Sequence, residues 1–274
     1  MSEIRLDRVE RDEVLVHVLV AAEPATVWSF LSDGDRFASW IGAYGGGPPL
    51  PGTHIDPKVG GSLRVCYPGQ GVAATGKITA MEPMRRIAFS WGYEDGHDGI
   101  AAASTQIEIN LTPMPDGTWV QLRHVGIPSD GARQGHIGGW KHYLSMLAGR
   151  AAERQHGDRL AGLWADYFRA WSESDEAARR RMLANCCEPA VRLRTAFACT
   201  DGIEAFSQHV ANALKHMPGV TLKMDGAPQL SHGFTRVGWT VEGPGGQTMM
   251  RGENFAGLSL GGKFATMISF PAGQ

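Results

Sequence analysis

The sequence predicts an α+β fold built as two successive domains, and three observations support this prediction. The chain has 274 residues, which is enough for two domains of ordinary size. Runs that alternate apolar and polar residues, as antiparallel strands do, fill its first half and end in an amphipathic helix. In the second half helical segments come first and four strand-like runs follow. We therefore expect domains at residues 1–148 and 158–274, joined by a polar linker or a continuation of the helix.

The first domain is predicted to open with a strand and two short helices. Residues 14–20, VLVHVLV, are rich in β-branched side chains, as strands are. Pro24 suits the first turn of a helix over 25–33, and a second short helix ends at Gly42. The glycine- and proline-rich stretch that follows reads as a long loop, of the kind often found beside ligands.

Strands of alternating pattern make up most of the remaining first domain. Apolar side chains occupy every second position in four runs, which predicts an antiparallel sheet with one apolar face. Asp116-Gly117 is a hairpin signal between the last two runs. A strongly bent sheet cannot close its own apolar face, so we expect the following helix to lie across it and leave a cavity. The four runs span residues 62–67, 86–91, 105–112 and 118–125.

That helix contains two adjacent glycines, Gly138 and Gly139. Its apolar residues, which include Ile137, Trp140 and Leu144, share one helical face. Each glycine costs a helix about 1 kcal/mol relative to alanine. Two explanations are open: the glycines allow close packing against the sheet, or they leave room for a ligand.

The second domain is predicted to begin with an aromatic helix. Residues 158–171 carry a wide apolar stripe, and a second helix over 174–186 has Ser174 as its expected cap. A strand over 190–198 and a third helix over 201–217 follow. Four strand-like runs then close the chain, so this half is predicted to be a cone of helices packed on a sheet.

Composition and charge exclude several classes of protein. With 43% hydrophobic and 20% charged residues the chain is predicted to be globular, and a net charge of −2 gives no reason to expect nucleic-acid binding. The four cysteines show no metal-ligand spacing, so we expect free thiols, no metal and no cofactor. The charged N-terminus is unlike a signal peptide, and the longest apolar run, VLVHVLVAA, is too short to span a bilayer. We therefore predict a cytoplasmic protein without membrane contact.

The blocks between residues 14 and 148 resemble the START-like (SRPBCC) superfamily. Within it they look like the family named after the C-terminal domain of the activator of the heat-shock-protein-90 ATPase. The resemblance rests on ATVWSFLSD, FASWIG, DPKVGGSLRV, GKITAMEPMRRIAFSWG and HIGGWKHYLSML, in this order. It implies a helix-grip fold, in which a curved antiparallel sheet grips a long C-terminal helix around a cavity. The usual paired tryptophans after the second helix are here Trp40-Ile41.

Residues 158–271 look like a SnoaL-like member of the ketosteroid-isomerase-like (nuclear-transport-factor-2-like) superfamily. The resemblance rests on the tryptophan-rich first helix, FSQHVANALKHMPGVTL and MMRGENFAGLSLGGKFATMISF. It implies an α+β cone with a pocket, and pairing of two copies through their sheets. Where isomerase-like members carry a catalytic acid, this chain has Arg192 and Arg194. No catalytic residue is therefore predicted.

The leading functional hypothesis is binding of a small hydrophobic or aromatic molecule in the first cavity, for sequestration or resistance. A polyketide cyclase or isomerase, and a co-chaperone that stimulates a chaperone ATPase, are the alternatives, so whether the protein is an enzyme stays open. The EDGHD loop at 94–98 has metal-like spacing, but polar residues are expected in such a loop. The expected ligand-binding residues are Trp28, Phe37, Trp40, Phe89, Trp91, His124, Trp140 and Tyr143. The expected second pocket comprises Trp164, Tyr167, Phe168, Trp239 and Glu253.

Overall fold

The computed structural model describes residues 4–10, 12–43, 47–68 and 71–272. The chain forms two compact units that divide between Arg154 and Gln155. Helix α3, Asp130–Ala170, passes through this point, so the polar stretch 149–158 is a helical continuation. Among the described residues, no helix is both long and apolar enough to cross a membrane.

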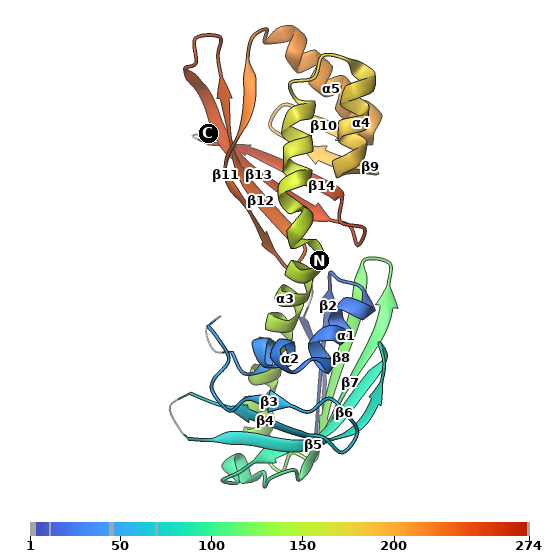
Figure 1. The fold of residues 1–274 in the computed structure, drawn as a ribbon, viewed down its shortest axis with the longest axis vertical. Coiled ribbons are helices and arrows are strands. Elements are labelled where there is room, and N and C mark those ends of the chain that lie inside the picture. The colour runs from blue at the N-terminus through green and yellow to red at the C-terminus, as the bar shows by residue number, and fades with distance from the viewer. Residues whose placement is uncertain (1–3, 11, 44–46, 69–70, 273–274) are drawn as a thin grey trace. The chain divides into compact units, whose positions relative to one another are not determined.

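The first unit is built on an eight-stranded antiparallel sheet with the order β1-β2-β8-β7-β6-β5-β4-β3 (Figure 1). The edge strand β1 was not expected from the sequence, because charged residues interrupt its apolar pattern. Its backbone pairs antiparallel with β2. Charged residues are common on sheet edges. The strands are β1 (Ile4–Glu10), β2 (Glu13–Val20), β3 (His54–Ile55), β4 (Ser62–Cys66), β5 (Ala73–Glu82), β6 (Arg86–Tyr93), β7 (Thr105–Met114) and β8 (Gly117–Val125).

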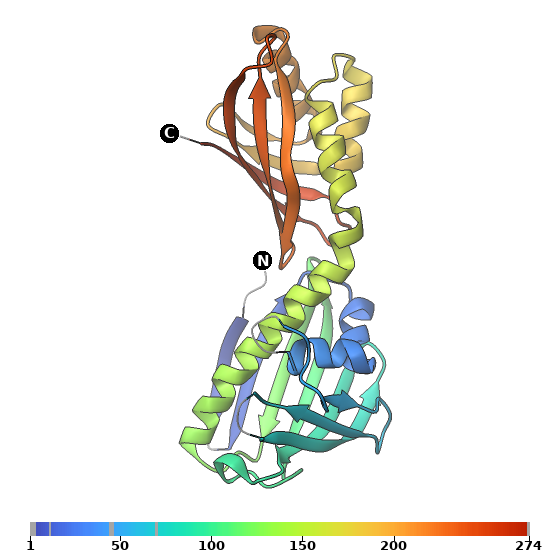
Figure 2. The same cartoon turned by 60° about the vertical axis from the view of Figure 1, so that its left-hand side comes forward.

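Helices cover the apolar face of this sheet. Helix α1 (Pro24–Ser32) begins at the predicted proline, and α2 (Gly34–Ile41) is capped by Asp33, whose carboxylate accepts from Arg36 N at 3.0 Å. The N-terminal part of α3 runs across the sheet (Figure 2), and the helix-grip prediction is confirmed. Its residues Ile137, Trp140 and Leu144 are buried in one core with side chains of the strands.

The second unit is a six-stranded sheet with the order β10-β9-β14-β13-β12-β11, and β9 and β14 pair in parallel. Three helical segments lie beside this sheet (Figure 1): α4 (Glu176–Cys186), α5 (Ile203–His216) and the C-terminal part of α3. The strands are β9 (Cys187–Arg194), β10 (Cys199–Asp201), β11 (Thr221–Ser231), β12 (Phe234–Glu242), β13 (Thr248–Leu258) and β14 (Phe264–Pro271).

The core of the second unit lies between its helices and one face of the sheet. Trp164 of α3 is fully buried against Phe264 of β14, with ring centroids 4.6 Å apart. Its indole N–H donates to Thr235 of β12 over 3.0 Å. The expected cap of α4 was one residue off, because Asp175 rather than Ser174 accepts from Ala178 N at 2.7 Å.

Candidate functional site

A cavity of about 490 Å³ lies in the first unit, between α3 and one end of the sheet. Trp91 and Tyr93 of β6 and the residues that follow β4 form one wall, and α3 forms the other. The 3₁₀ turn η1 (His97–Gly99) adds polar side chains. The lining residues are Tyr67, Pro68, Val72, Trp91, Tyr93, His97, Asp98, Gly135, His136, Gly138, Gly139, Trp140, His142 and Tyr143.

The two adjacent glycines of α3 belong to this lining. A Cβ atom built on Gly138 or on Gly139 would meet no atom within 4 Å outside the helix's own neighbouring backbone. Close packing against the sheet therefore does not explain them. Their effect is to leave two positions of the helical wall without side chains, which enlarges the space beside Trp140.

His124 of β8 is buried behind the cavity and holds Trp140 in place. Trp140 Nε1 donates to His124 Nδ1 over 3.1 Å, so this nitrogen carries no proton. The proton of the neutral ring is therefore on Nε2, which donates to Thr105 Oγ1 at 2.8 Å, and that hydroxyl donates to the backbone oxygen of Trp91 at 2.8 Å. Burial lowers the pKa of His124 well below its usual value. With both nitrogens occupied, His124 orients the indole and has no free lone pair for a ligand.

A second buried histidine, His136 of α3, lies in the lining itself. Its Nδ1 is 2.8 Å from the backbone oxygen of Ala132, which can only accept, so Nδ1 carries the proton. Nε2 then accepts from the Tyr93 hydroxyl over 3.1 Å. Burial lowers the pKa of His136, partly opposed by the bond to Ala132, and burial raises the pKa of Tyr93. The pair is therefore uncharged at neutral pH.

The tyrosines and the polar turn give the cavity two kinds of surface. Burial raises the pKa of Tyr67 well above its usual value, so its phenol stays protonated. Trp91 Nε1 is buried and has no hydrogen-bond acceptor among the described residues. His97 and Asp98 are exposed, and His97 Nε2 lies 3.7 Å from Asp98 Oδ1. The interior thus offers aromatic surface with neutral polar groups, and charge is confined to the exposed part of the lining.

Of the residues expected in this site, Trp91, Trp140 and Tyr143 line the cavity. Phe37, Trp40 and Phe89 are fully buried in the core beside it, outside its lining. Trp40 Nε1 donates to the backbone oxygen of Phe30 at 2.9 Å, which explains the indole without a ligand. Trp28 packs, partly buried, on the same core.

Sequence reasoning missed Tyr67, Tyr93, His97, Asp98, His136 and His142 of the lining. Two signals could have found some of them. Tyr93 follows Trp91 by two residues, which places both on one face of a strand. His136 precedes Trp140 by four residues, which places both on one face of a helix.

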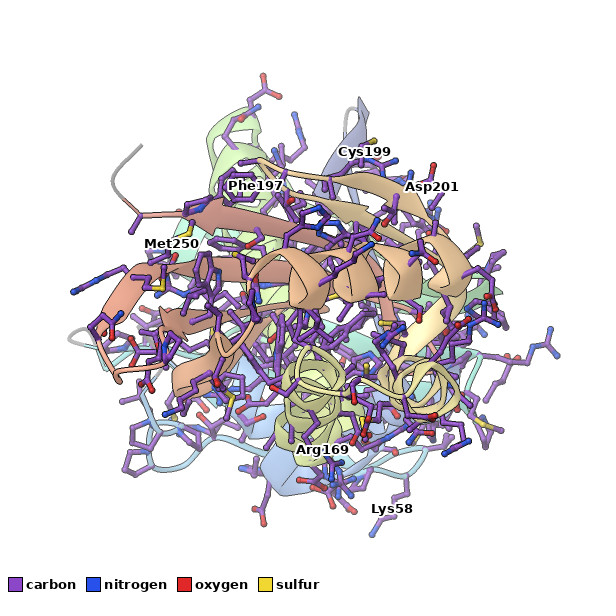
Figure 3. The ribbon with its side chains drawn as sticks, turned by 90° about the horizontal axis from the view of Figure 1, so that it is seen from above. Lys58, Arg169, Phe197, Cys199, Asp201 and Met250 are labelled. Atoms are coloured by element: carbon purple, nitrogen blue, oxygen red, sulfur yellow. The ribbon has the colours of Figure 1, made fainter. Side chains whose placement is uncertain are left out.

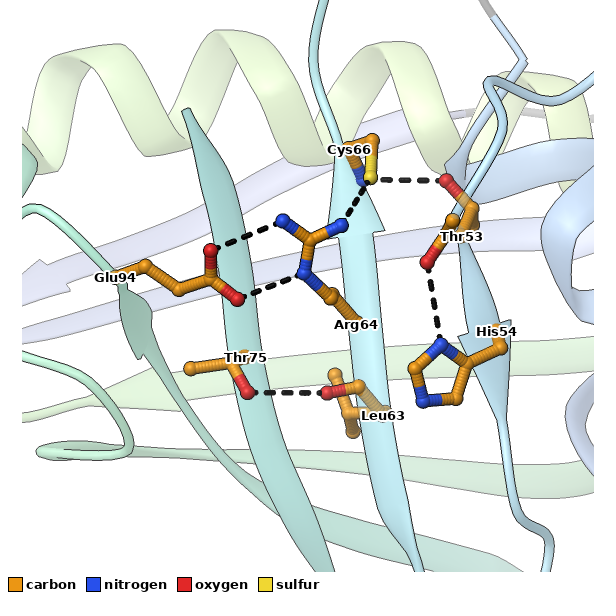
Figure 4. Close-up of polar contacts among 8 residues, drawn as sticks. Thr53, His54, Leu63, Arg64, Cys66, Thr75 and Glu94 are labelled. Carbon is orange, nitrogen blue, oxygen red and sulfur yellow. Dashed lines mark hydrogen bonds and ion pairs between the residues drawn. The ribbon is translucent and has the colours of Figure 1, made fainter. Parts of the chain in front are cut away.

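Glu94 of the EDGHD loop is engaged in an ion pair. Arg64 forms a two-pronged ion pair with Glu94, with Nε–Oε1 and Nη2–Oε2 distances of 2.7 and 3.0 Å (Figure 4). Arg64 also donates to Cys66 Sγ at 2.8 Å. The described residues contain no group of three or more metal-ligand side chains in a suitable cluster. The ion pair between Arg64 and Glu94 therefore links β4 to the loop after β6.

The second unit has its own cavity, of about 310 Å³. Tyr167 and Trp239, both expected there, belong to its lining, whereas Trp164 and Phe168 are buried in the core. Phe197 and Met250, labelled in Figure 3, also line it. The full lining is Tyr167, Trp171, Thr195, Phe197, His209, Asn212, Ala213, Leu214, His216, Met217, Val220, Leu222, Trp239, Val241, Met250, Asn254, Ser269 and Pro271.

Glu253, also expected in this pocket, lies elsewhere. It occupies a separate depression with Arg236 and Asp225, and its Oε1 is 3.7 Å from Arg236 Nη1. Its neighbour Asn254 lines the cavity, and successive residues of a strand point to opposite faces. Glu253 is therefore on the outer face of the sheet, and the cavity lining contains no Asp, Glu, Lys or Arg among the described residues.

The comparison with protein families gives a match within the first unit. Residues 21–152 match the family described as Activator of Hsp90 ATPase homolog 1-like protein. A search of curated proteins gave no significant match.

Three solved structures illustrate the likeness. An AHSA1-like protein from Rhizobium etli is 30% identical, over 51% of this chain and 81% of its own, with a TM-score of 0.38. CalU16 from Micromonospora echinospora is 26% identical, over 54% of this chain and 83% of its own, with a TM-score of 0.39. A protein of the SnoaL-like family from Agrobacterium tumefaciens is 22% identical, over 42% of this chain and 99% of its own, with a TM-score of 0.41.

Proposed function

Residues 21–152 form a domain of the Activator of Hsp90 ATPase homolog 1-like family, and from that premise we propose that the first unit binds a small aromatic or apolar molecule in the cavity beneath α3. The molecule lies against the tryptophan and tyrosine rings and next to the two glycines. Binding serves to hold the molecule, as in sequestration or resistance, and requires no cofactor.

The observation that carries this proposal is an aromatic cavity whose helical wall has two adjacent glycines, at positions where a side chain would have room. Gly138 and Gly139 each weaken α3 by about 1 kcal/mol relative to alanine. A Cβ on either would meet nothing within 4 Å, so the fold gains no close contact in return. Open space beside Trp140 is what the two glycines provide, and small-molecule sites are concave, largely apolar and few per protein.

The polar groups indicate where the ligand carries its own polar atom. Trp91 Nε1 is a buried donor without an acceptor in the described residues. Tyr93 and His136 are hydrogen-bonded to each other, so they form an uncharged wall and are less available to bond to a ligand. We therefore expect a ligand with at least one hydrogen-bond acceptor placed at Trp91.

The same Tyr93–His136 pair supports an alternative, proton transfer within the cavity, as a cyclase or isomerase requires. The phenol and the imidazole share one hydrogen bond, and their pKa values move apart because both are buried. A His136 whose lone pair is bonded to Tyr93 must first break that bond to act as a base. We therefore place binding ahead of catalysis.

Native mass spectrometry of the protein from its own host, followed by denaturing extraction, tests the proposal. We expect a small molecule of reproducible mass that is lost in Gly139→Leu and retained in Asn254→Leu, a change confined to the second unit. Loss in both variants would place the molecule elsewhere. Protein that is empty and refuses a panel of aromatic ligands would contradict the proposal and favour a protein partner, for which a chaperone pull-down is the next assay.

A further inference from the structure

The cavity of the second unit contains N–H groups that the protein leaves without acceptors. Trp171 Nε1, Trp239 Nε1 and Asn254 Nδ2 are buried and make no hydrogen bond with any described residue. All three side chains line the same cavity. Asn254 is only 2% exposed and Trp239 only 5%. In folded proteins most buried polar groups are paired, so three unpaired donors around one cavity need an explanation.

Two of these donors, those of Trp171 and Asn254, lie near the hydroxyl of Tyr167. The Tyr167 and Trp171 ring centroids are 6.2 Å apart. Burial raises the pKa of Tyr167 far above its usual range, and Trp171 and Asn254 lie near enough to oppose that rise in part. Neither of them reaches the hydroxyl with normal hydrogen-bond geometry. Tyr167 therefore stays protonated, and the N–H groups of Trp171 and Asn254 remain without an acceptor among the described residues.

The lining also carries no fixed charge. Its described residues include no Asp, Glu, Lys or Arg. His209, whose ring centroid is 5.6 Å from that of Trp171, has a pKa lowered by burial, so it is neutral at pH 7. A buried ligand anion would therefore lack a counter-charge and would lose its hydration without compensation. A neutral oxygen acceptor fits both the donors and the absence of charge.

We propose that the second-unit cavity binds a neutral, mostly apolar molecule through a carbonyl oxygen that accepts from Asn254 and the two indoles. The remaining lining, which includes Phe197, Leu222 and Met250, is apolar and encloses the hydrocarbon part. The cavity of about 310 Å³ is at the small end of the range for such sites. This site is separate from the one proposed for the first unit and does not depend on it.

Three naphthalene probes of similar shape test the proposal: acetylnaphthalene as the ketone, isopropylnaphthalene as the hydrocarbon and naphthoate as the anion. Their affinities are measured by titration calorimetry, and their position by NMR of the tryptophan indole N–H signals, assigned with Trp→Phe variants. We expect the ketone to bind roughly three- to tenfold more tightly than the hydrocarbon, since a hydrogen bond contributes about 0.5–1.5 kcal/mol net. The indole signals of Trp171 and Trp239 should move downfield.

Variants locate the effect. Asn254→Leu keeps the side-chain volume and should lower ketone affinity about three- to tenfold while leaving the hydrocarbon unaffected. Trp239→Phe should act in the same direction, and Trp119→Phe in the first unit serves as the matched control with no effect. Circular dichroism checks that each variant is folded.

Four outcomes would overturn the proposal. These are equal affinity for ketone and hydrocarbon, tightest binding of naphthoate, no binding of the ketone at its solubility limit, or ketone-induced shifts at Trp91 and Trp140 with none at Trp171 and Trp239. The last result would assign the probe to the first unit, whose own proposal it would leave standing.

Discussion

The two cavities satisfy their polar groups in opposite ways. In the first unit, His124, His136 and Tyr93 are bonded to other protein groups, and Trp91 Nε1 is a buried donor of the lining that has no partner in the described part of the chain. In the second unit, three buried donors have no partner there. The first cavity is therefore held in shape by its own network, whereas the second is complete only when an acceptor is supplied. Two aromatic cavities of one chain can therefore differ in binding chemistry as well as in volume, which is about 490 Å³ in the first unit and about 310 Å³ in the second.

The largest effect is expected from Trp140→Ala, which removes a cavity wall and the donor to His124 together. We expect a loss of about 3–5 kcal/mol in the free energy of unfolding, as for other buried tryptophans, together with weaker ligand binding. Trp140→Phe keeps most of the volume and should lose about 1–3 kcal/mol, because His124 Nδ1 is then unpaired. Denaturant titration measures both. A Phe variant as stable as the parent would show that the network does not hold the first cavity, and His232→Ala is the control for binding.

Two substitutions at Gly139 separate its effect on ligand binding in the cavity from its effect on the stability of the helix. Gly139→Ala should raise the free energy of unfolding by up to about 1 kcal/mol, because alanine favours the helix and its Cβ meets no atom. Gly139→Leu should lower the affinity for the first-unit ligand about tenfold, since its side chain enters the cavity. Calorimetry and thermal melts measure the two effects. Unchanged affinity in the leucine variant would remove the assigned function of the glycines.

The variant Asn254→Leu tests whether the Asn254 amide is available to a ligand or is needed for the stability of the fold. Since Asn254 Nδ2 has no acceptor among the described residues, its loss should not lower the midpoint of thermal unfolding and can raise it slightly. The same change at a paired buried polar group, such as Thr235→Val below Trp164, should lower the midpoint by several degrees. A drop of equal size in Asn254→Leu would mean that this side chain has a structural partner.

Acid should destabilise the first unit through its buried histidines. Burial lowers the folded-state pKa of His124 and His136 below the value of 6.5 that an unfolded histidine has. As pH falls through 6.5, the unfolded chain binds protons that the folded chain does not, so stability falls. His124→Gln should flatten the pH dependence of the unfolding midpoint more than His209→Gln, whose parent is only half buried. Equal slopes in both variants would contradict the difference between the cavities.

The smallest effect is expected at the outer face of the second sheet. The sequence-based expectation of a homodimer stays a prediction. Phe255 and Phe270 are 36% and 56% exposed, and their ring centroids are 5.9 Å apart. If a second copy covers this face, Phe270→Glu should shift a dimer to monomer in sedimentation velocity, with no change for Met84→Glu in the first unit. A parent protein that is monomeric at high concentration would end this expectation.

Part of the first site could be read from local patterns. Strand alternation placed Trp91 on the apolar face, and helical spacing placed Trp140 on the face that meets the sheet. The same patterns could not separate cavity from core, because Phe37, Phe89 and Trp91 look alike in sequence. Only the position of α2 over the sheet buries Phe37 and Phe89 completely.

By itself the sequence determined the order of the main helices and of most strands, though not the edge strand β1, as well as the two-part α+β fold and the aromatic character of both cavities, because these depend on short-range periodicity. The tertiary structure decided which polar groups are hydrogen-bonded within the protein and which remain available to a ligand. His124 is occupied because Thr105 and Trp140, from β7 and α3, converge on it. Glu253 and Asn254 are adjacent in sequence, yet one faces outward and the other lines the cavity. Hydrogen-bond pairing depends on distances between elements remote in the chain, and a shift of one residue in strand register reverses every side chain.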